Sequence, residues 1–194
     1  MNVRVLALLL FSAITCGCQI VPDRSQVTVQ LYDIGIPEER TLLPCCEGQV
    51  VLASVRAAPM LKSQNMWYRM GSDSMKPSTY AVSRWVANPA SLIEQYVRIA
   101  LGVAESERFD GAPYRMDIKL EAMEQQFHNG GSTAVLIVSV TLSRTSDRSV
   151  VENEVFRLSE PTDSADPLGG AEAQARLASL LVDQLQRWMC DAVE

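Results

Sequence analysis

The chain has 194 residues and a formal net charge of −6 at pH 7, with 17 Lys or Arg against 23 Asp or Glu. This acidic balance excludes nucleic-acid binding, which depends on clustered basic residues, and gives no electrostatic attraction to anionic lipid headgroups. The length is enough for one domain with a substantial core.

The first element in chain order is an apolar N-terminal run. Arg4 precedes the apolar residues 5–14, and small residues follow them. This layout is typical of a secretory signal peptide. A membrane-spanning helix needs roughly 20 apolar residues, so the run is too short for a permanent anchor. We expect residues 1–17 to be removed as a signal peptide.

The sequence Thr-Cys-Gly-Cys at 15–18 resembles the lipobox of bacterial lipoproteins, in which a small residue precedes the acylated cysteine. The resemblance implies cleavage after Gly17 and lipid attachment at Cys18, and several acyl chains anchor a protein firmly. Cys16 is the alternative site, but the Thr before it is a poorer neighbour for cleavage than Gly. Because Gln19 stands where inner-membrane lipoproteins carry Asp, the resemblance implies the periplasmic face of the outer membrane.

Three further cysteines are Cys45, Cys46 and Cys190. An exported protein can keep disulfides. Adjacent Cys45 and Cys46 are badly placed to bond each other, because an unstrained bridge needs specific geometry. A bridge from either of them to Cys190 remains open, and it would leave one thiol over.

After a lipidated tether at 18–25, residues 26–194 form a single predicted domain that begins with strands. Four segments are β-branched and apolar or alternate between polar and apolar residues, as strands do: 26–31, 50–55, 66–70 and 79–85. The polar loop at 71–78 predicts that the last two form a hairpin.

The pattern then changes to that of a helix. Asn88 and Pro89 suit a helix start, and the apolar face that follows ends at Gly102. Three more strands and a last helix are predicted at 114–122, 134–142, 150–158 and 171–190. The order predicts an α+β fold, a single mixed, mostly antiparallel sheet of about six or seven strands packed by two helices on one face.

The middle of the chain resembles a known family. A Pro-x-Leu segment at 59–61 leads to a strand ending in Arg69, Tyr80 then precedes an Arg-Trp strand end at 84–85, and a helix follows at once. With the later strand pair and a C-terminal Ala-x-x-x-Leu-Ala-x-Leu helix, this order resembles the ABC-type transport auxiliary lipoprotein family, the lipoprotein partners of MCE-type lipid-transport systems.

The resemblance implies a non-enzymatic accessory with no cofactor. Its expected partners are an MCE-domain protein and the ABC permease and ATPase complex, besides the membrane that holds its lipid anchor. Self-association into a homo-oligomer stays open. The alternative function is a structural or assembly-factor envelope lipoprotein with the same anchor and no ABC transporter partner.

The aromatic and basic residues of the predicted hairpin are the candidates for contact with a partner or a lipid: Trp67, Arg69, Tyr80, Arg84 and Trp85. Core packing is the alternative for the aromatic residues. The two arginines suit a phosphate headgroup or a partner carboxylate, and solvation at the strand ends is their alternative.

Catalytic and metal-binding patterns are missing from the sequence. The single histidine, His128, precedes a predicted Asn-Gly-Gly turn and keeps no motif spacing to a carboxylate or a cysteine. Alternation places most of four glutamates on the solvated face of the strands, which favours solvated charge over a catalytic carboxylate pair: Glu121, Glu124, Glu152 and Glu154. The run of methionines at 60–75 favours ordinary core over an adaptable apolar surface or a copper site. Gly169-Gly170 indicates a loop-to-helix junction, with an anion site as the alternative.

Overall fold

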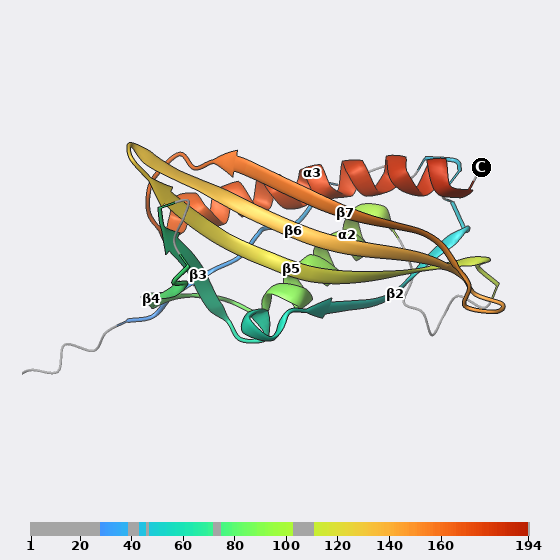
Figure 1. Ribbon diagram of the computed structural model, residues 1–194, viewed down its shortest axis with the longest axis horizontal. Coiled ribbons are helices and arrows are strands. Elements are labelled where there is room, and N and C mark those ends of the chain that lie inside the picture. The colour runs from blue at the N-terminus through green and yellow to red at the C-terminus, as the bar shows by residue number, and fades with distance from the viewer. Residues whose placement is uncertain (1–27, 39–42, 46, 72–74, 103–110, 194) are drawn as a thin grey trace, which may run out of the picture.

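Three long strands form an antiparallel meander at the centre of the fold. β5 (Tyr114–His128), β6 (Gly131–Arg144) and β7 (Val150–Pro161) pair over most of their lengths, and Figure 1 shows them running along the long axis of the molecule. The computed structural model describes residues 28–38, 43–45, 47–71, 75–102 and 111–193. The predicted meander is confirmed, and each strand is longer than its apolar alternation indicated.

The other edge of β5 is shared by two strands. β2 (Val50–Ala57) pairs in parallel with its first half, and β3 (Asn65–Met70) pairs in parallel with its second half. A short 3₁₀ turn at Pro59–Leu61 connects β2 to β3. β4 (Ser78–Trp85) returns antiparallel to β3, which confirms the predicted hairpin.

The complete sheet has seven strands in the order β1-β4-β3-β5-β6-β7, with β2 beside β5. β1 covers only Gln30–Tyr32 and pairs in parallel with β4. The observed strand therefore begins and ends later than the one predicted at 26–31, and residues 26 and 27 lie outside the described part of the chain. β1 is also more exposed than its alternation indicated, because β4 is its one neighbour in the described sheet.

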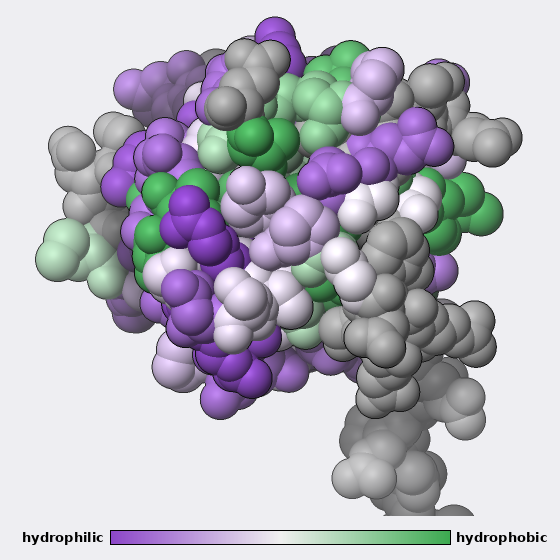
Figure 2. All heavy atoms as spheres, turned by 90° about the vertical axis from the view of Figure 1, so that its right-hand side faces the viewer, coloured by the Kyte–Doolittle hydropathy of each residue, from purple (hydrophilic) through white to green (hydrophobic). Residues whose placement is uncertain are grey.

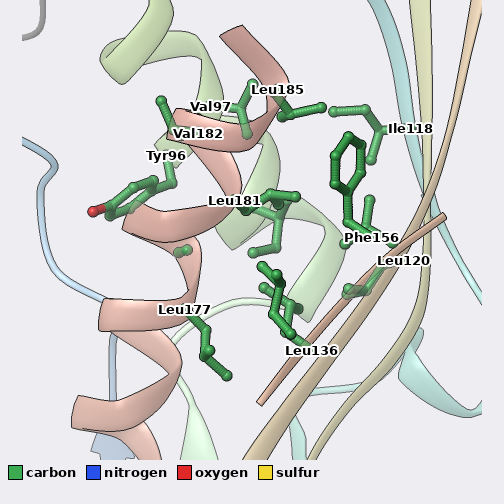
Figure 3. Close-up of a cluster of buried hydrophobic side chains, with 14 of the residues drawn as sticks. Tyr96, Val97, Ile118, Leu120, Leu136, Phe156, Leu177, Leu181, Val182 and Leu185 are labelled. Atoms are coloured by element: carbon green, nitrogen blue, oxygen red, sulfur yellow. The ribbon is translucent and has the colours of Figure 1, made fainter. Parts of the chain in front are cut away.

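Both helices pack on one face of this sheet. α2 (Pro89–Leu101) contacts β2 and β5, while α3 (Pro167–Val193) contacts β6 and β7. Figure 3 shows the side chains of the two helices meeting those of the strands. All of those that the figure labels are buried and aliphatic or aromatic: Tyr96, Val97, Ile118, Leu120, Leu136, Phe156, Leu177, Leu181, Val182 and Leu185. The predicted α+β architecture, one mixed sheet packed by two helices, is confirmed.

Local capping explains where the helices begin. The Asn88 side chain accepts from the Ser91 backbone N–H at 3.0 Å, and Pro89 follows it, as predicted. Asp166 does the same for α3, because its Oδ1 accepts from Gly169 N–H at 2.9 Å. α3 therefore starts four residues before the predicted position, since Gly169 and its neighbours belong to the first turn and not to a loop.

A disulfide joins Cys45 to Cys190, whose Cα atoms are 5.4 Å apart. It ties the segment before β2 to the last turns of α3. The bridge that the sequence left open is thus assigned to Cys45, and Cys46 lies outside the described residues.

β5 changes its register halfway. Leu120 lies opposite the buried Val138, but Ala122 lies opposite Ile137, whose side chain points to the other face. One extra residue, Glu121, causes this shift, as in a β-bulge. The alternation predicted through residue 122 consequently ends at Leu120, and the second half of β5 has the opposite phase.

The helix-free face of the sheet carries polar pairs. Ser54 donates to Asp117 at 2.5 Å, Ser139 donates to Glu121 at 3.1 Å, and the Lys119 ammonium lies 2.9 Å from Glu121. The hydrogen bond from Lys119 holds the pKa of Glu121 below its usual value.

In the described part of the chain, neither helix is long and apolar enough to cross a membrane.

Candidate functional site

Three of the five candidate residues, Trp67, Tyr80 and Trp85, line one small pocket. Trp67 and Arg69 lie on β3, while Tyr80, Arg84 and Trp85 lie on β4. The pocket between these strands, β5 and the start of α3 is lined by Met66, Trp67, Tyr80, Trp85, Met123, Glu124, Gln125, Gly170 and Gln174. The hairpin thus brings the tryptophans and the tyrosine together, and the two arginines flank them.

The two tryptophans of the site serve packing. Trp85 is 3% exposed and belongs to the core, which agrees with the core alternative for this residue and leaves it little surface for a partner. Trp67 is partly buried, and its Nε1 donates to the backbone oxygen of Met60 at 2.9 Å. Within the described residues, the buried Trp85 Nε1 and Gln174 Oε1 lack a hydrogen-bond partner.

A chain of hydrogen bonds runs from Tyr80 across the sheet. The Tyr80 hydroxyl donates to Gln125 Oε1 at 2.7 Å, and Gln125 Nε2 donates to Ser132 Oγ at 2.7 Å. Burial raises the pKa of the Tyr80 hydroxyl above its usual value, with nearby Tyr68 contributing, so Tyr80 stays protonated and keeps its donor. These bonds hold the amide of Gln125 in one orientation next to Gly170.

Arg69 forms an ion pair that the sequence did not predict. Its Nε lies 2.8 and 3.0 Å from the two carboxylate oxygens of Glu124, and Gln126 Nε2 donates to the same carboxylate at 2.9 Å. Glu124 is only 8% exposed, so it is an exception to the solvated face expected for most of the four glutamates. The bulge at Glu121 and the parallel pairing of β3 with β5 set this position, and neither is visible in the local sequence.

Arg84 is held by the backbone of its own strand. Its Nη1 donates to the carbonyl oxygens of Tyr80 and Ser83. Arg69 and Arg84 are partly buried, and each has some exposed surface. Both arginines therefore have structural bonds in addition to any contact with a partner.

The pocket itself is very small. Its volume of about 10 Å³ suits a single water-sized guest. An acyl chain or a drug-sized ligand needs hundreds of cubic ångströms. This pocket is therefore a packed junction between the hairpin and α3, and it is no lipid cavity.

The remaining candidates are dispersed. His128 is exposed and its Nε2 lies 3.0 Å from Thr133 Oγ1. Met66 is buried in the core, whereas Met70 and Met75 are 65% and 93% exposed. In the described ranges, no three His, Cys, Asp or Glu side chains are grouped so that they could hold a metal ion. Cys18 lies outside the described residues.

Sequence reasoning missed the polar residues that connect α3 to β5. Gln174 is 3% exposed, and its Nε2 donates to the backbone oxygens of Glu124 and Val135 at 3.2 and 3.0 Å. The sequence does contain a sign of this contact, because Gln174 lies on the apolar face of the last helix, between Ala171 and Leu177. A polar residue on such a face points to a buried partner.

Comparison with known proteins gives one family match and several structures with the same fold. A family model described as ABC-type transport auxiliary lipoprotein component matches residues 37–186. Protein XCC0632 from Xanthomonas campestris, of the family DUF330, superposes with a TM-score of 0.70 at 20% identity, covering 85% of this chain and 95% of that one. A second, uncharacterized protein gives 0.64 at 8% identity, with 82% and 97% covered. Curated proteins contain no significant match.

Proposed function

Because the chain belongs to the family of ABC-type transport auxiliary lipoprotein components, we propose that it acts as a non-enzymatic accessory of an MCE-type lipid-transport system. It stands on the periplasmic face of the outer membrane and binds an MCE-domain protein together with the ABC permease and ATPase. The family match over residues 37–186 carries this proposal.

The N-terminal segment supplies the anchor in this proposal. Residues 1–17 are removed as a signal peptide, Cys18 receives the lipid, and residues 18–25 connect it to the domain that starts at residue 26. The Gly-Cys junction at the end of the apolar run supports this reading, with Cys16 as the rival site. Several acyl chains hold the protein on the membrane permanently.

The geometry of the hairpin site supports a binding role for the body. Its polar groups are engaged in structural bonds: Tyr80 with Gln125, and Arg69 with Glu124. Its pocket is water-sized. We therefore propose that the exposed parts of Trp67, Arg69, Tyr80 and Arg84 contact a partner protein, while Trp85 supports them from the core.

Affinity purification of the lipidated protein from its native envelope tests this function. We expect an MCE-domain protein to be recovered with it, followed by the permease and the ATPase. A Cys18→Ser variant is the matched control, because it should be soluble and should lose the membrane partners. An Arg84→Glu variant that keeps its thermal stability should recover less MCE-domain protein.

The same purification separates the alternatives. Repeated recovery of envelope assembly factors without an MCE-domain protein would favour a structural lipoprotein and overturn the transport role. Membrane retention of the Cys18→Ser variant with lipid on Cys16 would move the anchor site and leave the transport role intact.

A further inference from the structure

The end of the molecule at which the chain enters exposes apolar side chains. We call it the anchor-side end; it comprises Met70 as the last residue of β3, Met75 ahead of β4, the β5–β6 turn and Leu168 at the start of α3. The register places these together, since Met70 lies opposite Phe127 and Tyr68 lies opposite Ser78. Figure 1 shows this end on the left, opposite the C-terminus.

β1 enters the fold from the same end. It runs parallel to β4, with Gln30 opposite Ser83, so Thr28 and Val29 lie on the side of Gln30 toward the start of β4. The exposed apolar residues here and on the adjoining β1–β4 edge are Val29, Leu31, Met70, Met75, Val82 and Leu168. Their exposed fractions reach 65% for Met70 and 93% for Met75.

The length of the tether decides which end can meet the membrane. Cys18 precedes Thr28 by ten residues, which span at most about 35 Å when extended. α3 has 27 residues and alone covers about 40 Å from the anchor-side end toward the other end. A lipid on Cys18 therefore meets the bilayer beside the anchor-side end with a relaxed tether, whereas the far end would need a tether that is almost fully extended along the body.

Charge argues for an uncharged lipid surface. The chain is acidic overall, and the anchor-side end has the exposed Asp166, Asp163 in an ion pair with Arg176 at 3.1 Å, and Lys76. This mixture gives no general attraction to anionic headgroups. The far end, which Figure 2 faces, intermingles hydrophilic and hydrophobic residues, and its exposed large apolar residues in the described chain include Leu43 and Val150.

We propose that the anchor-side end rests against the bilayer, with Met70, Met75 and Leu168 in contact with zwitterionic phospholipid. The inference rests on the proposed lipid anchor at Cys18 and adds an orientation to it. It leaves the far end, where the Cys45–Cys190 bridge lies, directed away from the membrane.

Methionine oxidation measures this contact without labels. The lipidated full chain is added from outside to preformed phosphatidylcholine vesicles, treated with chloramine-T and analysed by mass spectrometry. Oxidation of a methionine follows its exposure, so Met70 and Met75 should oxidise about fivefold more slowly on vesicles than in the soluble Cys18→Ser variant. A Val150→Met substitution at the far end, 56% exposed in the parent, is the matched control and should oxidise equally in both. Buried Met66 should resist throughout.

The oxidation pattern differs if the anchor-side end contacts solvent or a second copy of the chain in place of the bilayer. Equal oxidation of Met70 and of methionine at position 150 on vesicles overturns the proposal. Protection that appears in the soluble variant at high concentration, or that rises with protein density on the vesicle, assigns the surface to a second copy of the chain and also overturns it. Intact mass separates failure of the proposed lipid anchor from failure of the proposed orientation. Absence of lipid on Cys18 refutes both, whereas a lipidated protein with unprotected methionines refutes the orientation alone.

Discussion

Glycine is required at two positions at the start of α3, because neighbouring atoms leave no room there for a Cβ atom. A Cβ on Gly169 would collide with the backbone oxygen of Ser164, and one on Gly170 would collide with Gln125 Oε1. Both glycines are buried within the helix. Their pairing in the sequence indicates a loop equally well, and only the folded neighbours reveal the steric reason.

We predict that Gly169→Ala destabilises the protein. In a helix this change normally gains up to about 1 kcal/mol, but here displaced backbone should cost roughly 1–3 kcal/mol net. Urea unfolding measures the difference. Gly131→Ala is the control, because its nearest neighbour would be His128 Cε1 at an ordinary 3.8 Å. A stabilised Gly169→Ala protein would contradict the packing described here.

The ion pair between Arg69 and Glu124 gives a second prediction at this scale. Arg69→Ala leaves a carboxylate of 8% exposure without its cation, which should cost roughly 1–3 kcal/mol of unfolding free energy. Adding Glu124→Gln removes the buried charge and should recover part of the loss. Denaturant unfolding of the two single variants and the double variant measures the coupling, and strictly additive losses would disprove it.

Among the helices and strands, those with a regular pattern of apolar residues over many neighbouring positions could be predicted from the sequence. The helix after Asn88 and the meander were predictable, because capping residues and alternation act over neighbouring positions. The bulge at Glu121 was not predictable, since it depends on the pairing of β5 with β6. The aromatic residues of the site could therefore be identified from the sequence. The burial of Glu124 and Gln174 could not, because it depends on contacts between distant segments.

The start of α3 provides a prediction at the scale of an element. Asp166→Ala should cost about 1 kcal/mol of unfolding free energy near pH 7, because the helix loses its cap. The hydrogen bond from the Gly169 backbone, helped by Ser164, lowers the pKa of Asp166. The cap therefore stabilises fully above the unfolded pKa of about 3.9, and its contribution disappears as the pH falls through the lower folded value.

Unfolding curves between neutral and acidic pH measure this dependence. The difference between the parent and Asp166→Ala should shrink as the pH falls below about 3.9. Asp166→Asn is the control, since Asn also caps and does not titrate in this range. A difference that grows in acid would show that another group is responsible.

β7 is an edge strand of the sheet, and one of its residues blocks that edge. The Val155 backbone N–H donates to the carboxylate of Glu154, its own neighbour, at 3.0 Å. An amide that is engaged in this way cannot pair with another strand. Exposed Glu152 and Arg157 add charge along the same strand. The long edge of the meander is therefore protected against unspecific pairing.

For the whole molecule, the disulfide is the feature with the largest expected effect. Cys45 and Cys190 are 145 residues apart, and closing so long a loop restricts the unfolded chain. Cys190→Ala should therefore lower the unfolding free energy by about 2–4 kcal/mol. Urea unfolding with and without dithiothreitol measures it. The parent and Cys46→Ala should respond to the reductant, and Cys190→Ala should not; a Cys46→Ala protein that is indifferent to reductant would reassign the bridge.

In the export route proposed above, the same bridge orders the events of folding. A chain that crosses the inner membrane from its N-terminus presents Cys45 to the oxidising side long before Cys190, which lies near the end of α3. The native bond cannot close until α3 has almost completely emerged. In the interval Cys45 and its neighbour Cys46 are open to other thiols, so the protein should depend on an oxidoreductase that corrects premature pairings. Lipid attachment and delivery would then compete in time with the final covalent closure of the fold.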